Sequence, residues 1–174
     1  MKSFNSVLSV SGLVVAVAAS LSLGDAHAAT SFRELSGNAT SYCQTALPIF
    51  DGQVRKRPLA VQNEGTSNAF ITCSFTRHFN AVAATAITMY SQNNSAAAKD
   101  LTCTLVTGHA GGPTQFVAKT VTLPADGTQK FMRWLAADFT GGTFPDEQYS
   151  MTCNLLPGVG LNDSYLSFDE DVGA

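Results

Sequence analysis

The sequence predicts an all-β protein, an antiparallel β-sandwich or jelly-roll-like fold of about eight strands. Apolar and polar residues alternate with a period of two in several segments, and clusters of turn residues separate those segments. Four cysteines are available to cross-link strands. Hydrophobic residues make up 45% of the 174 residues and charged residues only 13%, which argues against an intrinsically disordered chain.

Residues 1–28 have the three parts of a secretory signal peptide. Lys2 supplies a positive charge, an apolar run extends from Val7 to Leu23, and Ala26-His27-Ala28 is a small-residue cleavage pattern. Serines interrupt the run, and it is slightly short for a membrane span, so we expect cleavage rather than a retained anchor. The mature chain is then expected to carry no transmembrane segment and to be secreted, either to the extracellular space or to the periplasm.

Export changes the expected role of the four cysteines, Cys43, Cys73, Cys103 and Cys153. An even number in an oxidising compartment predicts two disulfides. Their spacings of 30, 30 and 50 residues lack the close pairs of a zinc site. Three connectivities are possible, and we favour Cys43–Cys73 with Cys103–Cys153 because this pairing keeps the closed loops short.

The remaining chain is expected to form a loose N-terminal leader over residues 29–40 and a single β-sandwich domain over residues 41–174. Strands are clearest around residues 71–75, 101–105 and 149–155, where apolar residues and cysteine alternate with Ser, Thr and Asn. Further strands are expected near residues 58–62, 81–90, 116–123, 129–136 and 164–169. Alanines at 81–86 would also suit a short helix. We find neither a repeat nor a linker that divides the chain.

Turn residues separate the expected strands. Pro124-Ala125-Asp126-Gly127 predicts a hairpin, with Gly127 able to adopt a positive φ. The segments 107–114 and 138–147 are rich in glycine, each also contains a proline, and both are expected to be loops.

Two further features carry a resemblance to a known group. Ser36-Gly37 precedes Cys43, and the segment Tyr149 to Pro157 is followed by a last strand that ends in the acids Asp169-Glu170-Asp171. This pattern resembles a loose group of small secreted bacterial two-disulfide β-sandwich proteins of unknown function, with their Tyr-x-x-x-Cys-x-Leu-Pro element. An additional Leu precedes the proline here. The resemblance implies a β-sandwich and a two-disulfide frame, and it implies no activity.

No pattern in the sequence predicts a catalytic residue, a metal site or a cofactor. Past the signal peptide, His78 follows a strand and His109 lies in a Gly-rich loop with no G-x-S-x-G nucleophile motif elsewhere. Zinc motifs of the H-E-x-x-H type are absent. The C-terminal acids are expected to be solvated and to guard an edge strand, although calcium binding by them stays open.

The charge balance restricts the class of partner. Ten Lys and Arg against 13 Asp and Glu exclude a nucleic-acid binder that works by neutralising phosphates. The one basic cluster, Arg55-Lys56-Arg57, is expected to be a solvated turn or edge. The partner is therefore unknown, with an envelope, glycan or protein surface as the open choices.

Three classes of function remain. The favoured one is a secreted or cell-envelope protein with a non-enzymatic structural or interaction role. The first alternative is a glycan- or surface-binding module that uses exposed aromatic side chains, for which the candidates are Trp134, Tyr90 and Tyr149. The second alternative is a secreted hydrolase whose catalytic residues come together only in space.

We predict that the exported protein begins at Ala29. Ala26 and Ala28 would occupy the small −3 and −1 positions of the cleavage site, whereas cleavage one residue later would place His27 at −3. Intact-mass spectrometry of protein recovered outside the inner membrane measures this directly. A species that still carries residues 1–28 would contradict both the signal peptide and the compartment.

Overall fold

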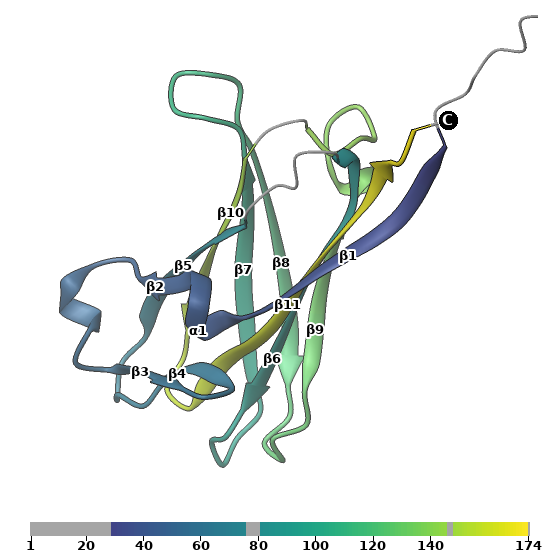
Figure 1. The fold of residues 1–174 in the computed structure, drawn as a ribbon. Coiled ribbons are helices and arrows are strands. Elements are labelled where there is room, and N and C mark those ends of the chain that lie inside the picture. The colour runs from purple at the N-terminus through teal and green to yellow at the C-terminus, as the bar shows by residue number, and fades with distance from the viewer. Residues whose placement is uncertain (1–28, 76–80, 146–147, 174) are drawn as a thin grey trace, which may run out of the picture.

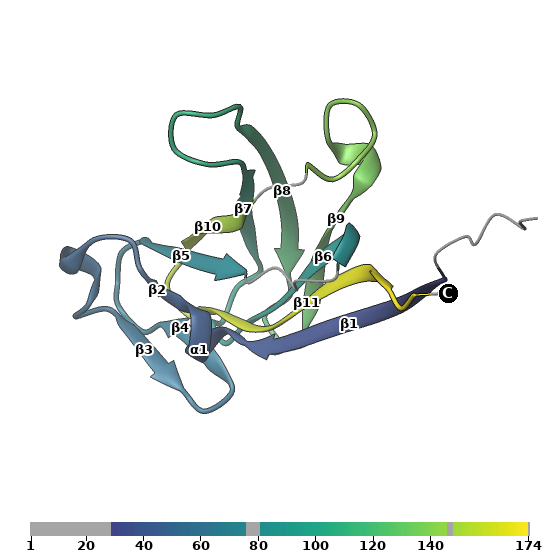
Figure 2. The same cartoon turned by 45° about the horizontal axis from the view of Figure 1, so that its top comes forward.

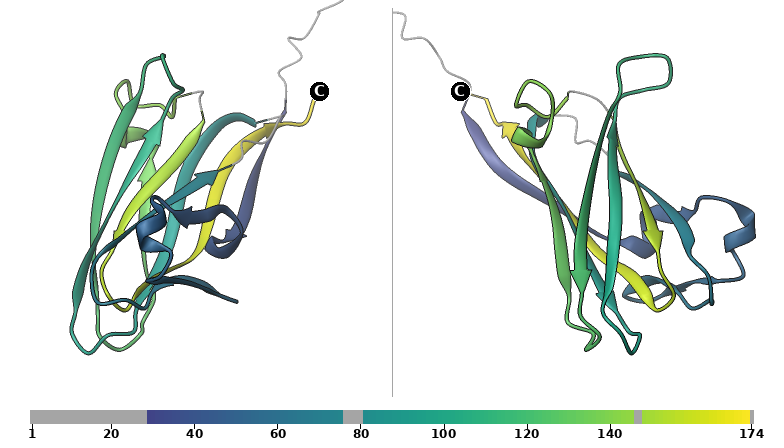
Figure 3. Two further views of the ribbon diagram at one scale, coloured as in Figure 1. Left: turned by 90° about the vertical axis from the view of Figure 1, so that its left-hand side faces the viewer. Right: turned by 180° about the vertical axis from the view of Figure 1, so that it is seen from behind.

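The chain folds as two antiparallel β-sheets packed face to face, seen in the computed structural model of Figure 1. The structure describes residues 29–75, 81–145 and 148–173, and the expected signal peptide and His78 lie outside them. Figures 2 and 3 show the two layers from other sides. The predicted antiparallel sandwich is confirmed, with eleven strands rather than about eight.

The first sheet has the strand order β3-β4-β11-β6-β9, with β1 also paired to β11. The second has the order β2-β5-β10-β7-β8. Two single-turn 3-10 helices and one short α-helix complete the described elements. The bounds are β1 Thr30–Asn38, α1 Ala39–Tyr42, β2 Cys43–Thr45, η1 Pro48–Phe50, β3 Val54–Arg57, β4 Ala60–Asn63, β5 Ala69–Phe75, β6 Ala81–Asn93, β7 Lys99–Thr107, β8 Gln115–Leu123, β9 Lys130–Leu135, η2 Ala136–Asp138, β10 Tyr149–Leu155 and β11 Val159–Asp171.

Residues 29–40 are not the loose leader expected from the sequence. Most of this segment is strand β1, which pairs with β11 along its whole length, from Thr30 opposite Asp171 to Asn38 opposite Asp163. The side chain of Arg33 forms an ion pair with Glu170 across the two strands, at 2.8 Å. Because β1 lies at a sheet edge and is mostly exposed, its sequence lacks the apolar alternation by which a half-buried strand is recognised.

The segment 124–127 is a turn, but it does not form the predicted hairpin. Gly127 has a φ of +75°, as the turn requires. The strands on either side belong to different sheets, since β8 is in the second and β9 is in the first. Turn residues look the same whether the chain returns along its own sheet or crosses to the other one, so the sequence could not separate the two cases.

Apolar residues of both sheets meet in one core between the layers. Trp134 is the largest fully buried side chain, and its indole Nε1 donates a hydrogen bond to the Val117 carbonyl of the opposite sheet, at 2.8 Å. Around it lie Ile71, Ile87, Met89, Leu101, Leu105, Met151, Leu155 and Leu161, all fully buried. Alternation along the strands places these residues inward and leaves their sequence neighbours on the outer faces.

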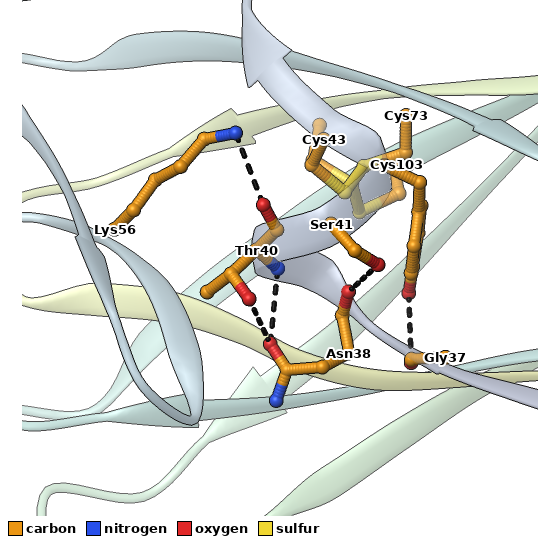
Figure 4. Close-up of a disulfide and its surroundings, with 10 residues drawn as sticks. Gly37, Asn38, Thr40, Ser41, Cys43, Lys56, Cys73 and Cys103 are labelled. Carbon is orange, nitrogen blue, oxygen red and sulfur yellow. Dashed lines mark hydrogen bonds between the residues drawn. A yellow bond between two sulfur atoms is a disulfide. The ribbon is translucent and has the colours of Figure 1, made fainter.

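Both disulfides lie in the second sheet and connect adjacent strands. Cys43 of β2 is opposite Cys73 of β5, and their Cα atoms are 4.0 Å apart. Cys103 of β7 is opposite Cys153 of β10, with Cα atoms 4.1 Å apart. These are the two pairings favoured from the sequence. Figure 4 shows the Cys43–Cys73 disulfide next to α1, where the side chain of Asn38 accepts hydrogen bonds from Thr40 and caps the helix.

Two arches carry the chain from the first sheet to the second, and they share a motif that sequence reasoning missed. Gln62-Asn63 ends β4 and Ile71-Thr72-Cys73 follows in β5. Thirty positions later, Gln92-Asn93 ends β6 and Leu101-Thr102-Cys103 follows in β7. The repeat is short and most residues between its ends differ, so no long-range similarity reveals it.

The asparagine of each motif is fully buried and holds its arch closed. Asn63 Nδ2 donates to the carbonyls of Ser67 and Leu155, both at 2.8 Å, while its Oδ1 accepts from the Gly65 backbone amide. Asn93 likewise donates to Ala97 at 2.8 Å and to Leu123 at 3.4 Å, and it accepts from the Ser95 amide. Each side chain therefore bridges its own arch to a strand end of the second sheet.

The turn between β10 and β11 fits between these arches. The Gly158 amide donates to the Asn63 carbonyl at 2.7 Å, and the Gly158 carbonyl accepts from the Asn94 amide at 2.9 Å. Gly158 has a φ of +84°, and a Cβ there would lie 2.8 Å from the Cβ of Ser95. Only glycine meets both requirements, so this end of the sandwich is closed by three interlocked connections.

We predict that Asn63→Ala lowers the free energy of unfolding by about 3 kcal/mol, because buried carbonyls and an amide lose their partner. Asn68→Ala is the matched control, since Asn68 is an exposed residue of the same arch, and we expect a change within about 0.5 kcal/mol. Urea unfolding of the oxidised proteins measures both values. Equal effects of the two substitutions would contradict the assigned role of Asn63.

Candidate functional site

Aromatic and polar side chains gather on the outer face of the first sheet, where β11, β6 and β9 lie side by side (Figure 1). In each of these strands, the core takes every second residue around this point. Met89, Met132 and Leu166 point into the core, and their neighbours Tyr90, Phe131 and Tyr165 therefore lie on the outer face. Three strands that are distant in sequence thus contribute one aromatic ring each.

The three rings form a connected cluster. Tyr90 lies between the other two, with its ring centroid 5.6 Å from that of Phe131 and 5.6 Å from that of Tyr165. Tyr90 is in register with Phe131, which puts the two side chains directly opposite each other. Phe131 is 54% exposed, and both tyrosines are partly exposed. The cluster therefore presents aromatic surface to solvent and also carries two phenol hydroxyls.

A hollow of about 180 Å³ opens beside the rings, and we call it the aromatic hollow. Charged and hydroxyl side chains line the rest of it, from Arg133, Glu34, Thr88 and Ser167. The Ser167 hydroxyl donates to Glu34 Oε2 at 3.3 Å, which orients the carboxylate. Among the residues that the structure describes, the Arg133 guanidinium has no carboxylate partner within 4.0 Å, so its donors stay available to a ligand.

A second hollow of about 380 Å³ adjoins the first on the same face, and we call it the amide hollow. Its polar groups are mostly amides, from Gln62, Gln92, Gln129 and Asn162. Its other lining residues are Arg57, Pro58, Leu59, Ala60 and Asp163. The two hollows share β6 and β11 and meet at the start of β9: Gln92 is two residues after Tyr90, Asp163 is two before Tyr165, and Gln129, just before β9, is two before Phe131.

Asn162 gives the amide hollow a buried polar group. Its side chain is 3% exposed, and Nδ2 donates to the Leu59 carbonyl at 3.1 Å. Its Oδ1 has no hydrogen-bond partner among the described residues. A register shift in the β11–β6 pairing between Leu161 and Ser164 places this residue irregularly in the sheet. Buried acceptors without a donor are uncommon, and they concentrate where an ordered water or a ligand completes the bonding.

The three aromatic residues predicted from the sequence as binding candidates differ in their exposure. Trp134 is fully buried and Tyr149 is 3% exposed, so neither can belong to a surface platform. The hydroxyl of Tyr149 donates to the Pro145 carbonyl at 2.8 Å, as a buried tyrosine requires. Tyr90 alone of the three lies in the surface cluster.

Two residues of the cluster were not singled out, although the sequence held a signal for one of them. In the stretch Phe131-Met132-Arg133-Trp134, a period of two puts Met132 and Trp134 on one face and Phe131 with Arg133 on the other. The charged residue marks the solvent face, so a buried Trp134 already implied an exposed Phe131. Tyr165 alternates with the buried Leu166, but the register shift between Leu161 and Ser164 interrupts the alternation just before it.

The candidates for chemistry that lie within the described residues do not come together. His109 is exposed in the loop after β7, where its ring lies against Gly112 and leaves no room for a Cβ on that glycine. Among the described residues, no group of three or more His, Cys, Asp and Glu could hold a metal ion. The acids Asp169 and Glu170 lie along β11 next to β1. No helix in the described part of the chain is long and apolar enough to cross a membrane.

A third hollow, of about 300 Å³, is more apolar and lies between the sheets near α1. Leu35, Tyr42, Phe75 and Leu166 line it. The Tyr42 hydroxyl donates to the Gly37 carbonyl at 3.3 Å, and burial raises the pKa of Tyr42 to about 12. Nothing in the structure shows what would cover these residues, so the aromatic and amide hollows form the better site.

No protein-family model and no curated protein matches the chain. Among solved structures, the C-terminal family 6 carbohydrate-binding module of a laminarinase from Zobellia galactanivorans aligns with 77% of this chain and 98% of its own, at 12% identity and a TM-score of 0.46. A family 11 carbohydrate-binding module from Clostridium thermocellum aligns with 78% of this chain and 87% of its own, at 11% identity and a TM-score of 0.44.

A family two carbohydrate esterase from Cellvibrio japonicus aligns at 11% identity and a TM-score of 0.44. The alignment covers 83% of this chain, which spans about a third of the length of the esterase, at 36%. At these levels of identity, the likeness to all three structures concerns the β-sandwich arrangement alone.

We predict an alkaline loss of stability that depends on Tyr42. The folded-state pKa of about 12 lies above the ordinary tyrosine pKa of 10.0, so the stabilisation from the neutral phenol is full below pH 10 and is lost as the pH rises from 10 to 12. The difference in unfolding free energy between the wild type and Tyr42→Phe should therefore be constant up to about pH 10 and shrink above it. Urea unfolding at pH 8 to 11.5 measures this, and a constant difference throughout would contradict the prediction.

Proposed function

We propose that this chain is a non-catalytic secreted binding protein, and that it binds carbohydrate across the aromatic hollow on the outer face of its first sheet. The cluster of Tyr90, Phe131 and Tyr165 beside an available Arg133 carries the proposal. A sugar ring has an apolar face of C–H groups and an equator of hydroxyls. The site offers a matching combination of aromatic faces and hydrogen-bonding groups in one hollow.

The hydrogen-bonding groups of the aromatic hollow suit hydroxyls in particular. The Arg133 guanidinium donates several hydrogen bonds, whereas the Glu34 carboxylate only accepts them. A sugar hydroxyl both donates and accepts, so two neighbouring hydroxyls can use the arginine and the carboxylate together. The hydroxyls of Tyr90, Tyr165 and Thr88 add groups that act in either direction.

The outer face of the second sheet is chemically different, which supports the choice of face. Its strands present threonines, and three of these bond to neighbours across the strands: Thr102 with Thr120 at 2.8 Å, and Thr122 with Asp100 at 2.6 Å. Phe116 is 70% exposed in β8, and none of the aromatic ring contacts found among the described residues includes it. Phe70 of β5 is also exposed, and its ring centroid lies 6.1 Å from that of Phe50. Among the described residues, the first sheet has the larger cluster, with three rings beside a hollow lined by Arg133 and Glu34.

Secretion agrees with the proposed role. Two disulfides are formed, and no free cysteine remains among the described residues. Disulfides persist in oxidising compartments, where extracellular and envelope glycans are also found. The proposal thus takes the broader expectation of an interaction role without catalysis and assigns it one face of the protein and one class of ligand.

We predict that Phe131→Ala weakens binding of the preferred polysaccharide at least tenfold, because the most exposed ring of the cluster is lost. Phe116→Ala is the matched control, since it also removes an exposed phenylalanine from a strand but on the opposite sheet. Affinity gel electrophoresis of the oxidised protein against a panel of soluble neutral and acidic polysaccharides measures both. The proposal fails if no polysaccharide of the panel retards the protein, or if the two variants behave alike.

A further inference from the structure

We infer that the ligand is a linear, neutral polysaccharide that lies lengthwise along β6, with one sugar unit over the aromatic hollow and the next over the amide hollow. This inference rests on the proposed function and adds the charge class of the ligand, its direction on the sheet and a minimum of two subsites. The observation that carries it is that Tyr90 of the aromatic hollow and Gln92 of the amide hollow are consecutive outward residues of β6, the strand between β11 and β9.

The two hollows are consecutive positions on the same face. In β6, Tyr90 and Gln92 are separated by one inward residue, which places their Cα atoms about 7 Å apart along the strand. Gln129 precedes Phe131 by two residues, just before β9 begins, and Asp163 precedes Tyr165 by two residues, within the register shift of β11. A displacement of this size is comparable with the repeat of one sugar unit in a linear polysaccharide, so neighbouring units can reach both hollows.

The Gln-Asn motif of the two arches explains why amides line the second hollow. Because alternate residues point to opposite sides of a sheet, burial of Asn63 and Asn93 places Gln62 and Gln92 on the outer face. Gly160 of β11 is in register with both glutamines. Because Gly160 has no side chain, β11 places no side chain between Gln62 and Gln92.

The amides of this hollow have unused hydrogen-bonding capacity. Gln62 Oε1 accepts from Asn94 Nδ2 at 3.2 Å, whereas the side chains of Gln92 and Gln129 bond to no described residue. Each glutamine amide offers two donor hydrogens and an acceptor oxygen. Such groups recognise hydroxyls of either polarity and carry no charge, which suits an uncharged sugar unit.

Neither hollow contains more cationic than anionic side chains, which favours a neutral ligand over an anionic one. The aromatic hollow contains Arg133 and Glu34. The amide hollow contains Arg57 and Asp163. Arg57 is held by Glu64 through two hydrogen bonds of 2.7 Å, and Asp163 accepts from Asn38 at 3.2 Å. A polyuronate would bring a carboxylate to every unit and meet no uncompensated cation in the second hollow, on a protein whose net charge is −3.

The test measures affinity against chain length. Isothermal titration calorimetry of the oxidised protein uses oligosaccharides of one to six units, prepared from the neutral polysaccharide that the panel shows to bind best. We expect affinity to rise at least tenfold between the monosaccharide and the longer oligosaccharides. In Gln92→Ala, the gain with length should fall at least fivefold while monosaccharide affinity stays within twofold of the wild type.

Gln44→Ala is the matched control, since Gln44 is an exposed glutamine on the second sheet, and it should reproduce the wild type at every length. Affinity that is independent of length, or a polyuronate preferred over every neutral polymer, would overturn the inference. So would a Gln92→Ala variant that keeps the full gain with length. If one of these results is found but a polysaccharide still binds and Phe131→Ala abolishes that binding, the proposed function stands and only the two-subsite inference fails. If no polysaccharide binds, both fail.

Discussion

The buried side chains of Asn63 and Asn93 are the constraint on which the sandwich depends. Each closes an arch that crosses between the sheets, and each also bonds to the end of a strand in the opposite sheet, at Leu155 and Leu123. A buried amide of this kind needs hydrogen-bond partners, because leaving it unpaired would cost more free energy than its packing against neighbouring side chains contributes. The requirement fixes where β4 and β6 end, and Gly158 fits between the two arches only in that arrangement.

The same two asparagines also affect the outer surface, because consecutive side chains of a strand point to opposite faces of the sheet. An asparagine that points inward forces the glutamine before it to point outward, so the structural motif and the amide hollow come from the same pair of residues. Further along β6, the inward Met89 places Tyr90 outward between Phe131 and Tyr165. β6 therefore positions the central group of both hollows, and its longest pairing, with β11, holds it between two neighbours that supply the remaining groups.

The two sheets differ in their cross-links and in the side chains on their outer faces, in keeping with the proposed binding role of the first. Both disulfides lie within the second sheet, where they link β2 to β5 and β7 to β10, and on its outer face Thr102 bonds to Thr120 and Thr122 bonds to Asp100. The first sheet has no covalent link of its own among the described residues. Its outer face combines ring surface, charged side chains of both signs and amides with unused hydrogen-bonding capacity, which suits the proposed exchange of water for a hydroxyl-rich ligand.

Local patterns in the sequence by themselves determined the all-β class, most strand positions, the inward orientation of the cysteines and the pairing of neighbouring cysteines, because each depends on a period of two or on short separation along the chain. They also placed Trp134 and Arg133 on opposite faces. Only the tertiary structure decided that β1 pairs with the last strand, that the turn at Gly127 crosses between sheets, and that Tyr149 is buried while Tyr90 is not. The candidate site combines residues from β6, β9 and β11. Contacts between such distant segments depend on strand order and register, and these are properties of the packed sheets rather than of any single segment.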